Sequence, residues 1–181
     1  PFDIVRDGEN TFSWTHEKMA HFLREQWERN PEGPHWENTK IWPTWLGAAG
    51  LGLRLYDILF DGSTHSIYND WWEYTKRVYI PFEDGNPPDF QTLYYDPVID
   101  YHHVAPSASG SLLYFHTAAQ HRQDTAILFE NMVDRLGWSE SVIIPDGERG
   151  VSSLVRTAAL AREFGKDLLY NNLISHADAN Y

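Results

Sequence analysis

The chain has 181 residues, a length that suits one domain with a buried core. Its 26 acidic residues outnumber its 14 Lys and Arg residues, and the resulting net charge of −12 disfavours nucleic acid as a partner. Cys is absent from the sequence, which excludes disulfides, thiolate nucleophiles and Cys-based zinc sites. No apolar run approaches the roughly 18 residues that cross a bilayer, so we expect no membrane span. The compartment stays open, with the cytoplasm favoured.

Apolar residues at helical spacing predict amphipathic helices along most of the chain. The expected helices cover residues 14–29, 51–61, 65–79, 107–121, 124–136, 151–164 and 166–177. In the second of these, Leu51, Leu55, Ile58 and Leu59 form the apolar stripe that we expect to pack against a neighbour. No convincing strand pattern interrupts the series. The sequence therefore predicts an all-α fold of helical-hairpin repeats, a solenoid or toroid, with an ordinary helical bundle as the alternative.

Residues 36–45 form a Trp-rich loop that leads into a helix, and this stretch is the strongest candidate for a site. Trp36, Trp42 and Trp45 lie close to Glu37 in the sequence. Apolar surroundings would keep a proton on Glu37 for donation, although a carboxylate that caps a helix is an equal interpretation. Trp, Tyr and Phe make up 15% of the chain, so we expect some of them to line a cavity for a sugar, an apolar ligand or a cation.

Residues 81–106 contain five prolines and lack the helical pattern, and a loop of this length is usually functional. We interpret it as a lid or site loop; the alternative is a surface loop whose aromatic side chains pack down. Its candidate side chains can bind a substrate or transfer a proton. They are Tyr94, Tyr95, Asp100, Tyr101, His102 and His103.

Three further residues are weaker candidates. His16 is either a pocket residue or part of a solvated helix face, and its spacing of five from His21 does not fit a helical zinc motif. Tyr56 precedes Asp57, which is either a second carboxylate of the site or a solvated acid at a helix end. We expect no metal, because the adjacent His102 and His103 diverge and lack a second ligand pair at a recognised spacing. No nucleotide-binding motif is present, so we expect no cofactor.

The order of these features resembles the linalool dehydratase/isomerase family, whose catalytic domain is an (α/α)6 toroid. The likeness covers most of the chain and is of moderate specificity. It consists of Trp14 and His16, then Glu37-Asn38, Ile41-Trp42-Pro43, the helix segment 53–57, Pro106-Ser107-Ala108 and the segment 154–165. The resemblance implies that residues 1–181 are a single helical domain that forms part of such a toroid.

The chain departs from this family at two positions. Trp36 and Trp45 stand where the family carries two cysteines, so thiol-assisted chemistry does not carry over. The indoles would instead stabilise positive charge, because a Trp face attracts a cation by roughly 0.5 to 2 kcal/mol. The chain also predicts fewer hairpins than a closed toroid takes and begins at Pro1. We therefore expect a fragment, completed by the remaining helices of the toroid or by another copy of the chain in a homo-oligomer.

The leading functional prediction is a terpenoid-modifying enzyme, a cyclase, isomerase or dehydratase, that acts on a small apolar or prenylated substrate. Glu37 or a histidine would protonate the substrate, indoles and Tyr101 would stabilise the cation, and His102 or His103 would remove a proton. A carbohydrate-active toroid is the first alternative, with two carboxylates facing each other across the pocket. A non-catalytic helical interaction module is the second, and it predicts that these acids and histidines lie scattered over the surface.

Overall fold

The computed structural model describes residues 2–6, 10–139, 141–142 and 151–181. The described residues form two β-hairpins, one short 3-10 helix and seven α-helices. This part of the chain is mostly helical, as the sequence predicted. In order, the elements are β1 (Phe2–Arg6), β2 (Asn10–Trp14), α1 (His16–Arg29), α2 (Pro43–Phe60), α3 (Ser66–Val78), β3 (Phe90–Asp96), β4 (Tyr101–Pro106), η1 (Ser107–Ser109), α4 (Ser111–Thr117), α5 (Arg122–Arg135), α6 (Val151–Glu163) and α7 (Asp167–Asn180).

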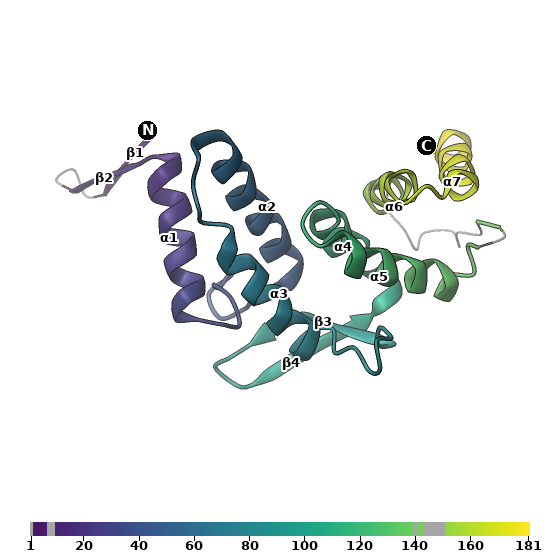
Figure 1. Cartoon of the computed structure of the whole chain (residues 1–181), viewed down its shortest axis with the longest axis horizontal. Coiled ribbons are helices and arrows are strands. Elements are labelled where there is room, and N and C mark those ends of the chain that lie inside the picture. The colour runs from purple at the N-terminus through teal and green to yellow at the C-terminus, as the bar shows by residue number, and fades with distance from the viewer. Residues whose placement is uncertain (1, 7–9, 140, 143–150) are drawn as a thin grey trace.

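The helices follow one another along an open arc (Figure 1). Helices α1, α2 and α3 lie at one end, α4 and α5 lie in the middle, and α6 and α7 lie at the other end. Along this arc α2 packs against α4 and α4 packs against α6, while α5 and α7 pack against α4 and α6 respectively. The described residues therefore build successive helical pairs, and they do not close into a ring.

A cluster of large aromatic side chains forms the core at the α1–α3 end. Trp27 of α1 and Tyr68, Trp71 and Trp72 of α3 are at most 2% exposed. Trp27 contacts Tyr68 and Trp71 with ring centroids 6.1 and 6.0 Å apart. Gly50 of α2 lies directly against the ring of Tyr68, where a Cβ atom would overlap the ring. Much of the aromatic content that the sequence assigns to a cavity is therefore core.

The expectation that strands are absent is wrong. Strands β3 and β4 form an antiparallel hairpin within the segment that we interpreted as an irregular loop, and β1 pairs with β2 near the N-terminus. Tyr, Thr and Val in β3 and β4 favour extended backbone. The tight connection between them is completed by Asp100, whose φ of 49° is left-handed. Pairing of β3 with β4 also determines which side chains lie next to one another and on which face, which an irregular loop would not do.

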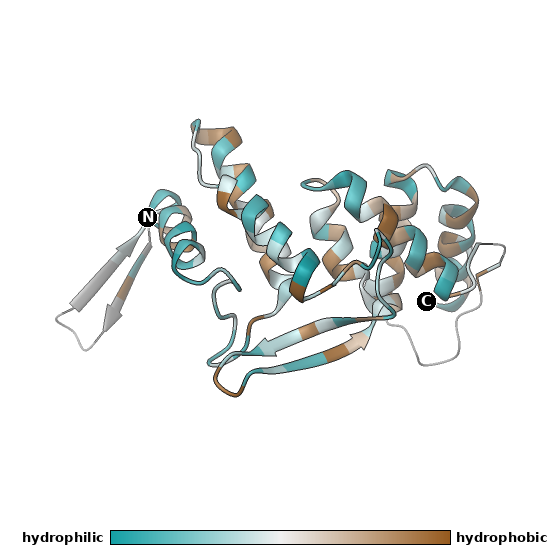
Figure 2. Ribbon diagram, turned by 60° about the horizontal axis from the view of Figure 1, so that its bottom comes forward, coloured by the Kyte–Doolittle hydropathy of each residue, from teal (hydrophilic) through white to brown (hydrophobic). Residues whose placement is uncertain are grey.

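The apolar stripe expected on α2 faces the wrong way. Helix α2 instead buries Leu46, Gly47, Gly50 and Leu53. Glycines on this face allow close approach, which is why α4 and Tyr68 lie against it. The predicted stripe is largely exposed, and Figure 2 shows apolar residues at the free tip of α2. Three members of the predicted stripe, Leu55, Ile58 and Leu59, are exposed, and so is the neighbouring Phe60.

Across the described ranges, none of the helices combines the length and apolar character needed to cross a bilayer.

Candidate functional site

The β3–β4 hairpin presents two different faces, each with one imidazole. Tyr94 pairs with His103 across the two strands, and Tyr95 pairs with His102. Because neighbouring residues of a strand point to opposite sides, these two pairs lie on opposite faces of the hairpin. The structure thus separates two histidines that the sequence places side by side.

The first face carries a stacked cluster that we call the Tyr94 cluster: Trp42, Tyr94, Tyr101 and His103. The rings of Tyr94 and His103 stack at 4.8 Å with an interplanar angle of 13°. Trp42 lies 5.0 Å from Tyr94, and Tyr101 lies 6.4 Å from His103. Lys40 Nζ lies 5.0 Å from the centroid of the Tyr94 ring, which places a cation against this cluster.

Hydrogen bonds join the Trp-rich loop to strand β3. The Ile41 amide donates to the Tyr95 carbonyl, and the Tyr95 amide donates to the Ile41 carbonyl, both at 2.8 Å. Nearby, the Thr39 hydroxyl donates to the Asp96 carboxylate at 2.9 Å. These contacts bring the two segments that the sequence singles out into one place, although more than fifty residues separate Thr39 from Asp96.

Glu37 lies at the exposed edge of this region. Its carboxylate pairs with Lys40 Nζ at 3.7 Å. The expected apolar surroundings are missing, because residues 36–40 form a turn at the surface in which the Lys40 amide donates to the Glu37 carbonyl. An open depression of about 430 Å³ is lined by residues 37–40. Among the described residues, Lys40 links Glu37 to the Tyr94 cluster, because Lys40 Nζ contacts both the Glu37 carboxylate and the Tyr94 ring.

Trp36 and Trp45 form a second aromatic feature. Their rings stack at 5.4 Å with an interplanar angle of 15°. They are 58% and 36% exposed, so the pair offers ring surface to a ligand. The indole N–H of Trp42 is buried and has no acceptor among the described residues. A ligand oxygen would supply that acceptor.

The other face of the hairpin packs on the core. His102 stacks on Tyr95 at 4.4 Å and contacts the buried Tyr79 at 5.9 Å. His102 Nδ1 is 3.0 Å from the Thr92 hydroxyl, and the Tyr95 hydroxyl donates to Asp100 at 3.1 Å. Partial burial and the hydrogen bond to Asp100 raise the pKa of Tyr95. We therefore assign His102, Tyr95 and Asp100 to packing of the hairpin.

His16, Tyr56 and Asp57 do not join this region. His16 lies at the start of α1, and Tyr56 and Asp57 lie near the end of α2. Figure 1 shows that these two helix ends lie far from the β3–β4 hairpin. The twelve residues from Trp45 to Asp57 alone correspond to about 18 Å along a helix. Helical spacing along the sequence does not reveal this separation.

Asp57 forms hydrogen bonds with the loop that precedes α3. Its carboxylate accepts hydrogen bonds from the Thr64 amide, the Thr64 hydroxyl and the His65 amide, each at 2.8 Å. Burial would raise the pKa of Asp57, but these hydrogen bonds outweigh it and hold the pKa below its usual value. Asp57 therefore anchors the loop before α3.

Sequence analysis missed Lys40, Thr39 and Thr92. The signal for Thr92 was present in the β-favouring composition of residues 90–106, which predicts a hairpin once the turn at residues 97–100 is recognised. Lys40 and Thr39 carried no comparable signal, because their roles depend on contacts with β3. Among the residues that the structure describes, no three His, Asp or Glu side chains gather as metal ligands would.

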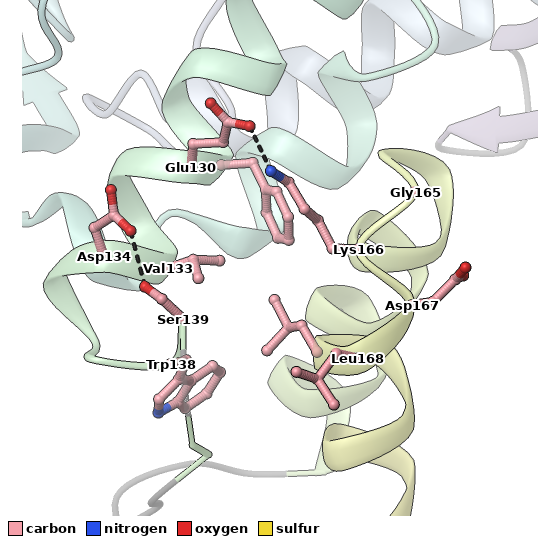
Figure 3. A pocket seen from close by; sticks show the side chains of 11 residues that line it. Glu130, Val133, Asp134, Trp138, Ser139, Gly165, Lys166, Asp167 and Leu168 are labelled. Atoms are coloured by element: carbon pink, nitrogen blue, oxygen red, sulfur yellow. Dashed lines mark hydrogen bonds and ion pairs between the residues drawn. The ribbon is translucent and has the colours of Figure 1, made fainter.

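A larger cavity lies elsewhere, between α5 and the start of α7, with a volume of about 550 Å³ (Figure 3). Phe129, Val133 and Trp138 contribute apolar surface to it. An ion pair of 2.6 Å between Lys166 and Glu130 lies at its edge. None of the side chains predicted as site residues lines this cavity, so its size alone does not link it to the chemistry of the Tyr94 cluster.

A comparison of the chain with models of known protein families finds no match, and a comparison with curated proteins finds no similar sequence.

Proposed function

We propose that this chain forms part of an acid–base enzyme of the terpenoid-modifying type, which isomerises, cyclises or dehydrates a small prenylated substrate. The observation that carries the proposal is the Tyr94 cluster, in which an imidazole stacks beside a Tyr and a Trp at the start of α2. A carbocation needs electron-rich ring faces and a base that removes its proton. His103 first donates a proton to the hydroxyl of an allylic alcohol, which leaves as water, and then, as a neutral imidazole, removes a proton from the cation. Trp42, Tyr94 and Tyr101 supply the rings.

Two further observations support this assignment. Lys40 already occupies a position over Tyr94, so the cluster accommodates positive charge. Helices α2, α4 and α6 pack in succession, which is the order that inner helices of an α/α toroid follow. In the proposed enzyme, further helices or a second copy of the chain cover the exposed Trp36 and Trp45 and exclude water from the reacting cation.

The decisive experiment measures products formed from a set of allylic prenyl alcohols and epoxides by gas chromatography with mass detection. We expect His103→Gln to lower the rate about 100-fold or more, because general acid–base groups contribute on this order. His176→Gln on α7 is the matched control, and it should leave the rate unchanged. Turnover that persists in His103→Gln, or no turnover of any prenylated compound, would contradict the proposal.

A carbohydrate-active enzyme is the second candidate, and the stacked, exposed Trp36–Trp45 pair favours it. Sugars bind to such ring faces. The carboxylates near this region are already engaged, however, because Asp96 accepts from Thr39 and Asp100 accepts from Tyr95. The same purified protein should therefore be offered oligosaccharides, and hydrolysis, elimination or epimerisation of a sugar would replace the terpenoid proposal. A chain that turns over neither class fits the interaction module instead.

A further inference from the structure

Strand β4 has an outer edge to which no backbone group bonds among the described residues. The outer edge of β3, in contrast, is covered. Tyr95 exchanges two backbone hydrogen bonds with Ile41, both at 2.8 Å. Farther along β3, the Thr92 amide donates to the Tyr79 carbonyl at 2.7 Å. Figure 1 shows β4 on the side of the hairpin that faces away from the helices. A further strand can therefore join this sheet only beside β4.

The register of the hairpin shows which backbone groups of β4 face this open edge. In an antiparallel ladder, residues that bond to each other alternate with residues whose amides and carbonyls point away from the partner strand. Tyr95 and Thr92 use their backbone groups on the far side of β3. Their cross-strand partners, His102 and Val104, therefore also point their amides and carbonyls away from β3. The open edge thus offers a donor and an acceptor on each side of His103.

These groups are complementary to a second copy of the same strand. When two β4 strands run antiparallel with His103 opposite His103, His102 of each copy lies opposite Val104 of the other. Both of these pairs exchange hydrogen bonds, which satisfies every amide and carbonyl that faces the open edge. The paired segment has natural ends, because Pro106 has no amide to donate and Asp100 turns the chain with a φ of 49°.

The sequence of β4 does not protect this edge. Edge strands of natural proteins commonly carry Lys or other charged residues, which discourage pairing with another chain. Residues 101–105 contain no Lys, Arg, Asp or Glu, and Tyr101 and Val104 are 47% and 53% exposed. In the arrangement above, the large Tyr101 side chain lies opposite the small Ala105 of the second copy, so the two sizes are compatible.

We propose that two copies of this chain associate through their β4 strands, in antiparallel register centred on His103, and form one continuous sheet. The contact is isologous, and the sheet does not grow beyond a dimer because both β3 edges are covered. Residues directly opposite each other in a ladder point to the same face. The two His103 side chains are therefore neighbours, and the two Tyr94 clusters meet at the two-fold axis. This inference does not depend on the proposed chemistry, because it uses backbone geometry and exposure alone.

The first test measures self-association by analytical ultracentrifugation at concentrations up to about 1 mM. We expect the unmodified chain to pass from monomer to dimer as its concentration rises. Val104→Pro removes an amide that makes no hydrogen bond to β3, so it should weaken the dimer about 10-fold or more and leave the helical circular dichroism unchanged. Val104→Thr is the matched control, because it keeps the amide and a branched side chain. A chain that remains monomeric, or a dimer equally stable in Val104→Pro, overturns the inference.

The second test uses the absence of Cys, because a single introduced Cys can form a disulfide only with a second copy of the chain. Opposite residues of a non-hydrogen-bonded pair have Cα atoms about 4.5 Å apart, which is within disulfide range. His103→Cys should therefore cross-link rapidly in oxidised glutathione. Val98→Cys is the control, since Val98 is 71% exposed but lies outside the paired segment. Equal cross-linking rates in the two variants contradict the proposed register.

Hydrogen exchange then locates the interface in the unmodified chain. The amides of His102 and Val104 should become more protected as the protein concentration rises. A dimer in which these two amides stay unprotected would place the contact elsewhere, for example at the exposed tip of α2, and would overturn the inference. Loss of the dimer in Val104→Pro with unchanged turnover of a prenyl alcohol would leave the proposed enzyme intact, and a dimer without any turnover would support the β4 contact alone.

Discussion

Two regions of this molecule are rich in aromatic residues, and they use them differently. In the α1–α3 core, Trp27, Tyr68 and Trp71 contact one another and are almost fully buried. Around the Tyr94 cluster, rings also stack, but Trp36 is 58% exposed and Tyr101 is 47% exposed. Both regions have ring contacts between 4.8 and 6.4 Å, so ring contact alone does not distinguish a core from a site.

The difference lies in what surrounds the rings. The core rings are enclosed by helices. The Trp71 indole N–H donates to the Glu32 carbonyl at 3.1 Å, whereas the Trp27 N–H and the Tyr68 hydroxyl have no hydrogen-bond partner among the described residues. The Tyr94 cluster instead includes proton-carrying and charged groups at an open surface, namely His103 and Lys40. The proposal for the Tyr94 cluster therefore rests on the exposure of its rings and on their titratable neighbours, and not on the number of aromatic residues.

The largest change in stability is expected from a substitution in the α1–α3 core. Gly50→Ala would place a methyl group that overlaps the ring of Tyr68, which is fully buried. We expect a loss of about 3 kcal/mol in the free energy of unfolding, measured by urea denaturation. Gly52→Ala on the same helix meets nothing within 4 Å and should stabilise the chain by about 0.5 to 1 kcal/mol. Equal effects of the two substitutions would contradict this packing.

A smaller effect depends on pH. His121 stacks on Trp72 at 5.2 Å, and burial is the main cause that lowers its pKa to about 4. The unfolded chain binds a proton at a higher pH than the folded chain, so this contribution is complete above about pH 6.5 and is lost as the pH falls toward 4. After allowance for solvent, the loss is about 2 kcal/mol.

His121→Phe tests this dependence, because it keeps a flat ring against Trp72 and removes the titrating group. The free energy of unfolding of the variant should change less between pH 6.5 and 4 than that of the unmodified chain. An unchanged slope would mean that other groups, such as the neighbouring Asp124, dominate acid unfolding in this window.

A substitution of Asp57 tests whether this carboxylate has a structural or a functional role. Asp57→Ala removes acceptors from the two amides before α3, and we expect it to cost about 1.5 kcal/mol in the free energy of unfolding. Asp70→Ala, at an exposed position of α3, should change stability by less than about 0.5 kcal/mol. A loss of ligand turnover without a loss of stability in Asp57→Ala would return this residue to the site.

The smallest effect on stability is expected at the exposed aromatic pair. Trp36→Ala should change the free energy of unfolding by less than about 0.5 kcal/mol, because most of the side chain is already in water. The same substitution should remove part of the change in Trp fluorescence when a ligand binds. A cost comparable to that of a buried Trp would show that Trp36 belongs to the core.

The sequence predicted the helices well because each has a regular apolar spacing. Helix α1 begins where such spacing begins, and the Thr15 hydroxyl caps it by accepting a hydrogen bond from the Lys18 amide at 3.1 Å. The prediction failed for α2, where both faces are apolar and periodicity cannot say which one a neighbour covers. The buried face of α2 is set by glycines that admit Tyr68 and α4.

The candidate site was predicted in part. Tyr94, Tyr101 and His103 do lie with Trp42, although this depends on strand pairing that the sequence analysis did not recognise. Glu37 lies next to them but at an exposed turn. Whether a residue is buried depends on contacts between distant segments. The bridge between Ile41 and Tyr95 is such a contact, and the spacing of apolar residues along the sequence does not predict it.

The β3–β4 hairpin contains an irregularity between Thr92 and Tyr94, where the register of the two strands shifts. Since side chains alternate along a strand, displacing the ladder by one position would exchange the surroundings of His102 and His103. Inserting or deleting one residue at this bulge would then turn the other imidazole outward without changing any side chain. Which of the two imidazoles faces away from the core is thus determined by strand alignment as much as by amino-acid type.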